Sequence, residues 1–214
     1  MKKLAVLLLF SSFFLISIDS EAQSFRGGML GGVTFSQVNG DGYSGYNQVG
    51  GTVGGFVSLP LAKSTSLCME MKYSLLGAHS SVKEVVEYYM NPFNLRLHYA
   101  EVPLMVRYDL SRFRVGNKSL DFIALEAGIG LDFLLGYRDR TADSENNNAG
   151  WLFFSMTGNV GIHFQIRDHW GVGLRSMNSF TPIRLKENGA WYGGNYYNIA
   201  IQIVMTYTIF SPRD

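Results

Sequence analysis

Charged side chains at alternate positions of apolar segments are the groups in this sequence whose spacing could do chemistry. In LCMEMKYSL (67–75), Glu70 and Lys72 share one face, whereas leucine, methionine and tyrosine occupy the other. The same pattern recurs along the chain, and the ionisable residues on its polar faces are Glu70, Lys72, Glu101, Arg107, Glu126, Asp132, His163 and Arg175, with Arg26 as a further candidate. Opposite charges on converging faces suit either an ion gate or a static salt-bridge network, because an unpaired buried charge is strongly destabilising.

The remaining reactive side chains do not form a recognisable catalytic or metal-binding pattern. The four histidines, His79, His98, His163 and His169, lie on different segments, without an HExxH motif or metal-ligand spacing. A histidine such as His163 on a polar strand face is expected to hydrogen-bond structurally. Cys68 has no second cysteine in the chain with which to form a disulfide. We therefore expect no catalytic residue, no metal and no cofactor.

Eight segments with a period of two must position these residues, because such alternation is the signature of a strand. They cover about residues 25–37, 49–59, 67–75, 97–110, 120–137, 151–166, 170–177 and 198–209. Pro103 cannot donate a ladder hydrogen bond, so a local bulge or irregularity is expected there. Residues 78–95 fit either a helical turn or extensions of the neighbouring strands. Connections after the first, third, fifth and seventh segments are long and polar, and the others are shorter.

The composition of the polar faces decides which face is outside. Alternation alone also fits a soluble barrel with its apolar residues inside. However, a water-exposed face is normally rich in lysine and glutamate, whereas here glycine, alanine, serine, threonine, asparagine and glutamine dominate. Only 16% of all residues are charged, against about 25% in ordinary globular proteins. We predict an all-β, eight-stranded antiparallel up-and-down transmembrane β-barrel, monomeric, with apolar faces toward lipid.

This interpretation assigns both faces of the segment WLFFSMTGNVGIHFQI (151–166). Phe154 and Val160 belong to its lipid-facing set, and Asn159, His163 and Gln165 to a crowded polar lumen. Aromatic residues near strand ends are expected to form two interfacial belts. These residues are Tyr108, Tyr137, Trp151, Trp170, Tyr196, Tyr197 and Phe210.

The first residues read as a targeting segment. MKK supplies positive charge, Leu4–Ile18 is apolar, and the small residues Ser20 and Ala22 precede an expected cut after Ala22. Residues 1–22 are thus predicted to be a signal peptide, and residues 23–214 one barrel domain in the outer membrane. No later segment has 18 or more consecutive apolar residues, as a spanning helix would need. A net charge of +1 gives no reason to expect a nucleic-acid partner.

Three stretches carry a family resemblance: GGMLGGVTFSQVNGDGYSGYNQVGGTVGGFVSLPL, LCMEMKYSLLG and HYAEVPLMVRY. They resemble the PorT-like outer-membrane β-barrel proteins of Bacteroidetes-type bacteria, and Tyr99, Glu101 and Pro103 are the most characteristic piece. The resemblance implies an eight-stranded barrel in the outer membrane. The family takes its name from a member needed for export of proteases by the type IX secretion system, so it also implies a link to protein secretion.

The expected function is that of a non-enzymatic envelope protein or adaptor. Its partners would be outer-membrane lipid and, through the long loops, other envelope or secretion proteins. Exposed tryptophan and tyrosine are favoured anchors, so Trp191, Tyr192 and Tyr196 are a candidate binding surface. One alternative is a narrow pore or gated channel through the polar lumen, although eight strands leave room for little more than side chains. The second alternative is a membrane-embedded enzyme that modifies lipid or peptide.

Overall fold

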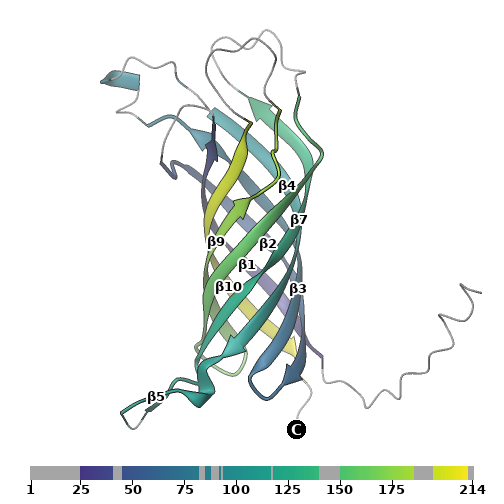
Figure 1. Cartoon of the computed structure of the whole chain (residues 1–214), viewed down its shortest axis with the longest axis vertical. Coiled ribbons are helices and arrows are strands. Elements are labelled where there is room, and N and C mark those ends of the chain that lie inside the picture. Colours follow the sequence, from purple (N-terminus) through teal and green to yellow (C-terminus); the bar gives the residue numbers. More distant parts are fainter. Residues whose placement is uncertain are drawn as a thin grey trace, which may run out of the picture.

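Eight long antiparallel strands close into a tilted barrel (Figure 1). The computed structural model describes residues 25–40, 45–81, 85–87, 92, 94–116, 118–139, 150–185 and 195–211. The barrel strands are β1 (Arg26–Asn39), β2 (Gln48–Ala62), β3 (Thr65–His79), β4 (Asn94–Asp109), β7 (Ile123–Asp139), β8 (Phe154–Gln165), β9 (Trp170–Ser179) and β10 (Tyr197–Phe210). The predicted fold class is confirmed, and each of the eight predicted segments corresponds to one of these strands.

Pairing of β1 with β10 closes the ring, and every other neighbour in the ring is also the next barrel strand in the chain. The β1–β10 ladder extends from Gly27 opposite Phe210 to Asn39 opposite Tyr197. Closure matters because an open sheet edge would leave backbone donors and acceptors unpaired in lipid. In the described part of the chain, no helix has the length and apolar character needed to cross a membrane.

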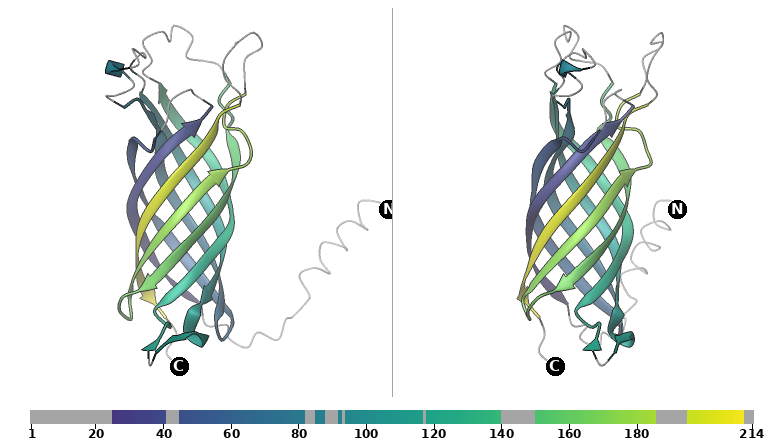
Figure 2. Two further views of the ribbon diagram at one scale, coloured as in Figure 1. Left: turned by 60° about the vertical axis from the view of Figure 1, so that its left-hand side comes forward. Right: turned by 90° about the vertical axis from the view of Figure 1, so that its left-hand side faces the viewer.

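The barrel has two distinct ends (Figures 1 and 2). At the turn end lie the start of β1, the end of β10 and the connections 63–64, 110–122 and 166–169. At the loop end lie the ends of β1, β3, β7 and β9 and the starts of β2, β4, β8 and β10. The connection after β4 is longer than expected and contains a 3₁₀ helix, η1 (Leu110–Arg112), and a hairpin of β5 (Arg114–Val115) and β6 (Lys118–Ser119). Strands of two residues are too short to show alternation, so the sequence pattern missed them.

Residues 78–95 combine the two forms that the sequence left open. Ala78 and His79 extend β3, and Asn94 and Leu95 begin β4. Val85 and Val86 between them are helical. Both strands therefore extend past the predicted segments toward the loop end.

Pro103 lies within β4, and the strand continues through it. The β3–β4 ladder pairs Lys72 with Glu101 and Met69 with Leu104, but omits Val102 and Pro103. Pairing resumes in the same register, because a proline without an N–H removes a bond but does not displace the strand. A register shift in β4 lies instead between His98 and Tyr99, on the side that faces β7. An irregularity thus exists at Pro103, whereas the bulge lies nearer the loop end.

Alternate residues face opposite sides of the wall as predicted. In β8, Val160 is 58% exposed, whereas Ser155, Thr157 and Asn159 are at most 3% exposed. The exposed set on the barrel exterior is almost wholly apolar, as contact with lipid requires. Gln165 shares the inward side with His163 and lines a cavity at the turn end, where it is exposed and its amide donates to the carbonyl oxygen of Arg167 at 2.7 Å.

Candidate functional site in the lumen

Strand register brings the predicted charged residues together inside the barrel. Lys72 pairs with Glu101, Glu101 with Asp132, and Arg107 with Glu126. Arg175 is two strands away from Glu126, because Gly161 on β8 lies between them in the register. A Cβ atom on Gly161 would lie 2.8 Å from Arg175 Cγ, so the glycine leaves the space through which Arg175 reaches Glu126.

Arg175 is the centre of the first charge cluster. Its Nη1 donates to Glu70 Oε2 at 2.8 Å, and its Nε donates to Glu126 Oε2 at 2.8 Å. Arg107 donates to Glu126 Oε1 through Nε at 2.9 Å and through Nη2 at 2.6 Å. These four residues form a chain of alternating charges, with two guanidinium groups and two carboxylates. Such charge-assisted, forked hydrogen bonds are the strong kind.

Lys72 is the centre of the second cluster. Its Nζ donates to Gln202 Oε1 at 2.7 Å and lies 3.2 Å from Glu101 Oε2. It also lies 3.7 Å from Glu70 Oε2, which links the two clusters. Gln202 is fully buried and was not among the predicted members of the charge network, because its side chain carries no charge. Its place on the polar face of the last strand was the available signal.

Asp132 stands beside the second cluster with a weaker set of partners. Its Oδ1 accepts from Thr157 Oγ1 at 3.5 Å, and its cross-strand neighbour is the carboxylate of Glu101. Asp132 Oδ2 and Glu101 Oε1 accept no hydrogen bond from the described residues, although both side chains are buried. The first cluster thus contains two guanidinium groups and two carboxylates and is neutral. The second cluster is not balanced, because its one cation, Lys72, stands beside the two carboxylates of Glu101 and Asp132.

His163 and Arg26 are the two predicted members at the edge of this arrangement. His163 is 3% exposed, and its Nδ1 lies 3.7 Å from Glu126 Oε1, so it adjoins the first cluster. Arg26 does not join the internal network. It is exposed at the start of β1, because the first residue of the strand lies outside the closed part of the barrel. It lines a cavity at the turn end.

That cavity has a volume of about 170 Å³ and mixed charge. Arg26, Lys63 and Arg107 line it together with Asp109, Asp121 and Asp168. The cavity extends inward as far as Arg107 and His163, whereas Glu126 and Arg175 do not line it. The cavity therefore borders the first charge cluster on its Arg107 side.

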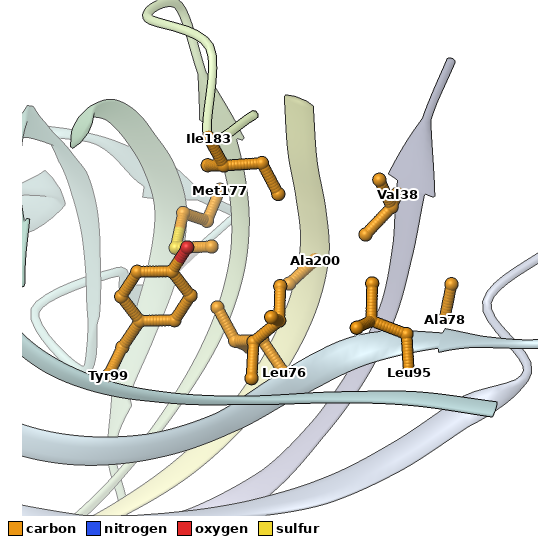
Figure 3. Close-up of a cluster of buried hydrophobic side chains, with 9 residues drawn as sticks. Val38, Leu76, Ala78, Leu95, Tyr99, Met177, Ile183 and Ala200 are labelled. Carbon is orange, nitrogen blue, oxygen red and sulfur yellow. The ribbon is translucent and has the colours of Figure 1, made fainter. Parts of the chain in front are cut away.

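Apolar side chains fill the other part of the lumen, toward the loop end (Figure 3). This apolar cluster consists of Val38, Leu76, Ala78, Leu95, Leu97, Tyr99, Met177, Ile183 and Ala200. Its members point toward one another from β1, β3, β4, β9 and β10, with Ile183 from the connection that follows β9. A crowded polar lumen was expected, and the apolar cluster corrects that prediction for the part toward the loop end. The signal was present in the apolar inward positions near strand ends, such as Leu95 and Leu97.

The connection after β9 folds over the apolar cluster. Ile183 is fully buried, its backbone N–H donates to the Tyr196 carbonyl oxygen at 2.8 Å, and its own carbonyl oxygen accepts from Leu152 at 2.8 Å. The guanidinium carbon of Arg184 lies 5.2 Å from the Trp151 ring centroid and 5.5 Å from that of Tyr196. These contacts hold the end of the lumen closed.

Two aromatic predictions change as a result. Tyr196 and Trp151 are half-buried and pack against the apolar cluster. Tyr196 is therefore not an exposed anchor, and Trp151 is not part of a lipid-facing belt. Trp191 and Tyr192 lie outside the described residues. At the turn end, Trp170 is 43% exposed and packs against Tyr207 with ring centroids 4.8 Å apart and the ring planes tilted by 54°, as a belt residue would.

The lumen thus offers charge pairing and packing rather than a catalytic constellation. Within the described ranges, no group of three or more histidine, cysteine, aspartate or glutamate side chains is placed to hold a metal ion.

Comparison with known proteins agrees with the fold. A family profile described as outer membrane protein beta-barrel domain matches residues 21–184. No curated protein sequence matches the chain. One similar solved structure is Ail, the attachment invasion locus protein of Yersinia pestis, with a TM-score of 0.46 and 11% identity over 86% of this chain and 98% of that chain. Neisserial surface protein A has a TM-score of 0.44 and 10% identity over 87% and 97% of the two chains. The outer membrane protein AlkL has a TM-score of 0.41 and 9% identity over 91% and 95%.

Proposed function

Because this chain belongs to the family of outer-membrane proteins with a β-barrel domain, we propose that it is a non-enzymatic envelope scaffold with a closed lumen. The observation that carries this proposal is the double filling of the barrel. A salt-bridge layer around Arg175 blocks the lumen on one side, and the apolar cluster blocks it on the other. A barrel of this kind acts through the surfaces that it presents at its ends.

The filling argues against the pore alternative. An eight-stranded barrel has an interior just wide enough for side chains, and here large ones occupy it. Arg175, Tyr99, Leu97 and Gln202 are each at most 2% exposed. An ion crossing this lumen would have to separate paired charges and then pass through an apolar layer. We assign no gating role to the charges; their role in this proposal is to hold the wall strands in register.

The two ends suggest an orientation. Outer-membrane barrels carry short turns on the periplasmic side and longer loops outside. We therefore place the turn end in the periplasm and the loop end outside the cell. Residues 1–22 would act as the signal peptide, and residues 23–214 would insert as one monomeric domain.

A role in protein secretion is the finer part of the proposal. It rests on the resemblance of HYAEVPLMVRY and the other two stretches to PorT-like proteins. Tyr99, Glu101 and Pro103 share the inward face of β4, where Tyr99 joins the apolar cluster and Glu101 faces Lys72. The most characteristic piece of the resemblance thus has a structural use in the barrel. Any contact with secretion proteins would come from the loop end or from the turn-end hairpin.

Conductance tests the closed lumen. Purified protein reconstituted into a planar bilayer should show no steady current above the protein-free baseline, with an open porin as the positive control. Steady, concentration-dependent conductance by the wild-type protein would overturn the scaffold proposal and favour the pore. Glu70→Gln gives a matched variant, because it weakens the charge layer while the apolar cluster stays intact. This variant should also show no steady current above the baseline.

Gene deletion tests the link to secretion. Culture medium and envelope fractions of the deletion strain would be compared by quantitative proteomics with those of the parent. Loss of a set of secreted proteins, restored by the wild-type gene, supports the adaptor role. Complementation with a gene in which residues 186–194 are replaced by a glycine–serine segment of equal length then asks whether the loop end is the contact surface. An unchanged set of secreted proteins would limit the function to an envelope role without secretion.

A further inference from the structure

A small patch of basic residues interrupts the apolar exterior of the barrel near the loop end. It lies on β3, β4 and β7 and consists of His79, Arg96, His98 and Arg138, with Tyr73 beside it. Arg96 and Arg138 are exposed and are direct cross-strand partners. Their outward direction follows from β4, where the flanking Leu95 and Leu97 are buried in the lumen.

Among the residues that the structure describes, no counter-charge explains this pair. Like charges directly opposite each other in a sheet destabilise it. In the described part of the structure, neither Arg96 nor Arg138 takes part in an ion pair. Asp139 follows Arg138, but it pairs with the inward-facing Leu95 and so belongs to the other face. Within the described residues, the two guanidinium groups thus have no anion beside them, and an external anion could pair with both.

His98 extends the set of donors toward the apolar surface. Its Nδ1 lies 2.6 Å from the hydroxyl oxygen of Tyr73, and the two rings are 6.0 Å apart. If the tyrosine hydroxyl donates to Nδ1, the ring N–H of His98 is on Nε2 and is free to donate outward. The cross-strand partner of His98 is Gly136, where an added Cβ would meet no atom within 4 Å. The outer surface of the barrel therefore has free space at Gly136, between His98 and the arginine pair.

The height of the patch matches a lipid headgroup. Tyr108 and His98 face outward on β4, with only Ala100, Val102, Leu104 and Val106 between them on that face. Ten residues at a rise of about 3.3 Å and a tilt of about 45° span about 23 Å along the barrel axis. The apolar band of such barrels is about 25 Å tall. Arg96 therefore lies just beyond the hydrocarbon, at the level of the headgroups.

We propose that Arg96 and Arg138, with His98, bind a phosphate group of an outer-leaflet lipid, namely phosphorylated lipid A. Guanidinium groups recognise phosphate oxygens through forked, charge-assisted hydrogen bonds, and a phosphate between them would remove their mutual repulsion. The acyl chains would then lie against the apolar faces of β4 and β7. The inference rests on the orientation given under Proposed function, with the loop end outside.

Native mass spectrometry of the purified protein in a mild detergent tests the site. The protein would be titrated with diphosphorylated lipid A and with the same lipid after removal of its phosphates. Wild-type protein should bind the phosphorylated lipid, and the double variant R96Q/R138Q should bind it about 25-fold more weakly, at about fivefold for each arginine. The matched control R112Q/R114Q removes two exposed arginines from the turn end and should bind like the wild type.

Stability in the same detergent provides a second readout. Without lipid, R96Q/R138Q should be at least as stable to heat as the wild type, because the repulsion has been removed. With phosphorylated lipid A, the wild type should gain more thermal stability than the variant. The proposal is overturned if the two proteins bind the phosphorylated lipid equally, or if removal of the phosphates leaves wild-type binding unchanged. Equal weakening in R112Q/R114Q would also overturn it, because the effect would then reflect overall charge.

Cysteine labelling separates this proposal from the one on which it rests. Cys68 is buried, so a new surface cysteine should be the main site of reaction. In intact cells, a membrane-impermeant maleimide should label Phe180→Cys at the loop end and leave Arg112→Cys at the turn end unlabelled. The reverse pattern would overturn the orientation and the lipid A assignment, but not the closed lumen, which conductance decides. Correct labelling with no difference in lipid binding would overturn the phosphate site and leave the scaffold proposal intact.

Discussion

The two layers that close the lumen are built from side chains of opposite chemistry. The inward face of β4 shows both: Arg107 and Glu101 stand toward the turn end, and Leu97 and Leu95 follow toward the loop end. The charge layer depends on a few contacts of 2.6–2.9 Å between named atoms. The apolar cluster depends on many weak contacts among its members. The charge layer should therefore lose its stabilising effect when one charged partner is removed. The apolar cluster should instead lose stability in proportion to the side-chain volume that is removed.

This difference also separates specificity from bulk stability. Charged layers tend to give a protein less net stability than apolar packing, because burying the charges is itself costly. They do, however, penalise a wrong register severely, since every slip of one residue turns an inward charge toward lipid. We infer that the charge layer fixes the pairing of β3, β4, β7 and β9, and that the apolar cluster seals the end.

Arg175→Met should give the largest loss of stability. Arg175 is 2% exposed and contacts both Glu70 and Glu126, so its removal leaves carboxylates without their shared cation. Breaking a buried charge network in this way costs about 3–5 kcal/mol. Urea unfolding in lipid vesicles, followed by tryptophan fluorescence, would measure the free energy of unfolding.

The matched control for that variant is Arg114→Met. Arg114 is exposed in the turn-end hairpin, and its loss should change the free energy of unfolding by less than about 0.5 kcal/mol. Adding Glu70→Gln to Arg175→Met should restore part of the stability, because one orphaned charge disappears. An effect of Arg175→Met no larger than that of the control would show that the charge layer is not a stabilising unit.

Leu97→Ala should have the next largest effect, in the apolar cluster. Leu97 is fully buried, and truncation of such a side chain costs about 2–5 kcal/mol through lost burial and the cavity that remains. No second-site substitution of a charge should rescue it, in contrast to Arg175→Met. The same urea titration tests this, with exposed Leu135→Ala on the lipid face as the control. A loss at Leu97 equal to that at Leu135 would mean that the cluster is loosely packed.

The sequence was most informative where alternation was long and unbroken. Strands β1, β2, β3 and β10 could be predicted with their faces, because fixed parity assigns every residue to lipid or lumen. The gathering of Glu70, Glu126 and Arg175 could be predicted as a class, since buried charges must pair. Their actual partners could not, because pairing across the lumen depends on side-chain reach and on gaps such as Gly161.

The loop end was less predictable for a different reason. The apolar cluster depends on inward positions of five strands and on Ile183 from a connection without regular structure. Alternation says nothing about where such a connection folds. The prediction that Arg26 faces the lumen was wrong for a similar reason. Alternation along a strand assigns a residue to one face, but it does not show whether the end of the strand lies within the closed wall.

Gly54→Ala tests how tightly the charge layer is fitted. Gly54 is the cross-strand partner of Lys72, and a Cβ there would lie 2.2 Å from the Met71 carbonyl oxygen and 2.6 Å from Lys72 Cβ. Relief requires the backbone to move, and overpacking of this kind costs about 1–3 kcal/mol. Gly136→Ala is the control, since its Cβ would meet nothing within 4 Å. Equal stability of the two variants, measured by urea titration, would show that the wall around Lys72 adjusts freely.

Asp132→Asn should have the smallest effect, and it tests whether the two clusters of the charge layer contribute differently to stability. Asp132 faces the like charge of Glu101 across the strands, and its one hydrogen bond from a described residue is the 3.5 Å contact from Thr157. The amide keeps an acceptor for Thr157 and removes the repulsion. We expect the free energy of unfolding to stay level or to rise by up to about 1 kcal/mol.

Glu126→Gln is the matched comparison for this variant, because it also converts one lumen carboxylate to an amide. Glu126 accepts from both Arg107 and Arg175, so its neutralisation should cost about 3 kcal/mol. Paired urea titrations of the two variants would measure the contrast. If Asp132→Asn is as damaging as Glu126→Gln, then Asp132 is neutralised by a cation in the folded barrel, and the division of the layer into a balanced and an unbalanced cluster is wrong. If only Glu126→Gln is damaging, the alternating chain through Arg175 is the part of the lumen that holds the barrel together.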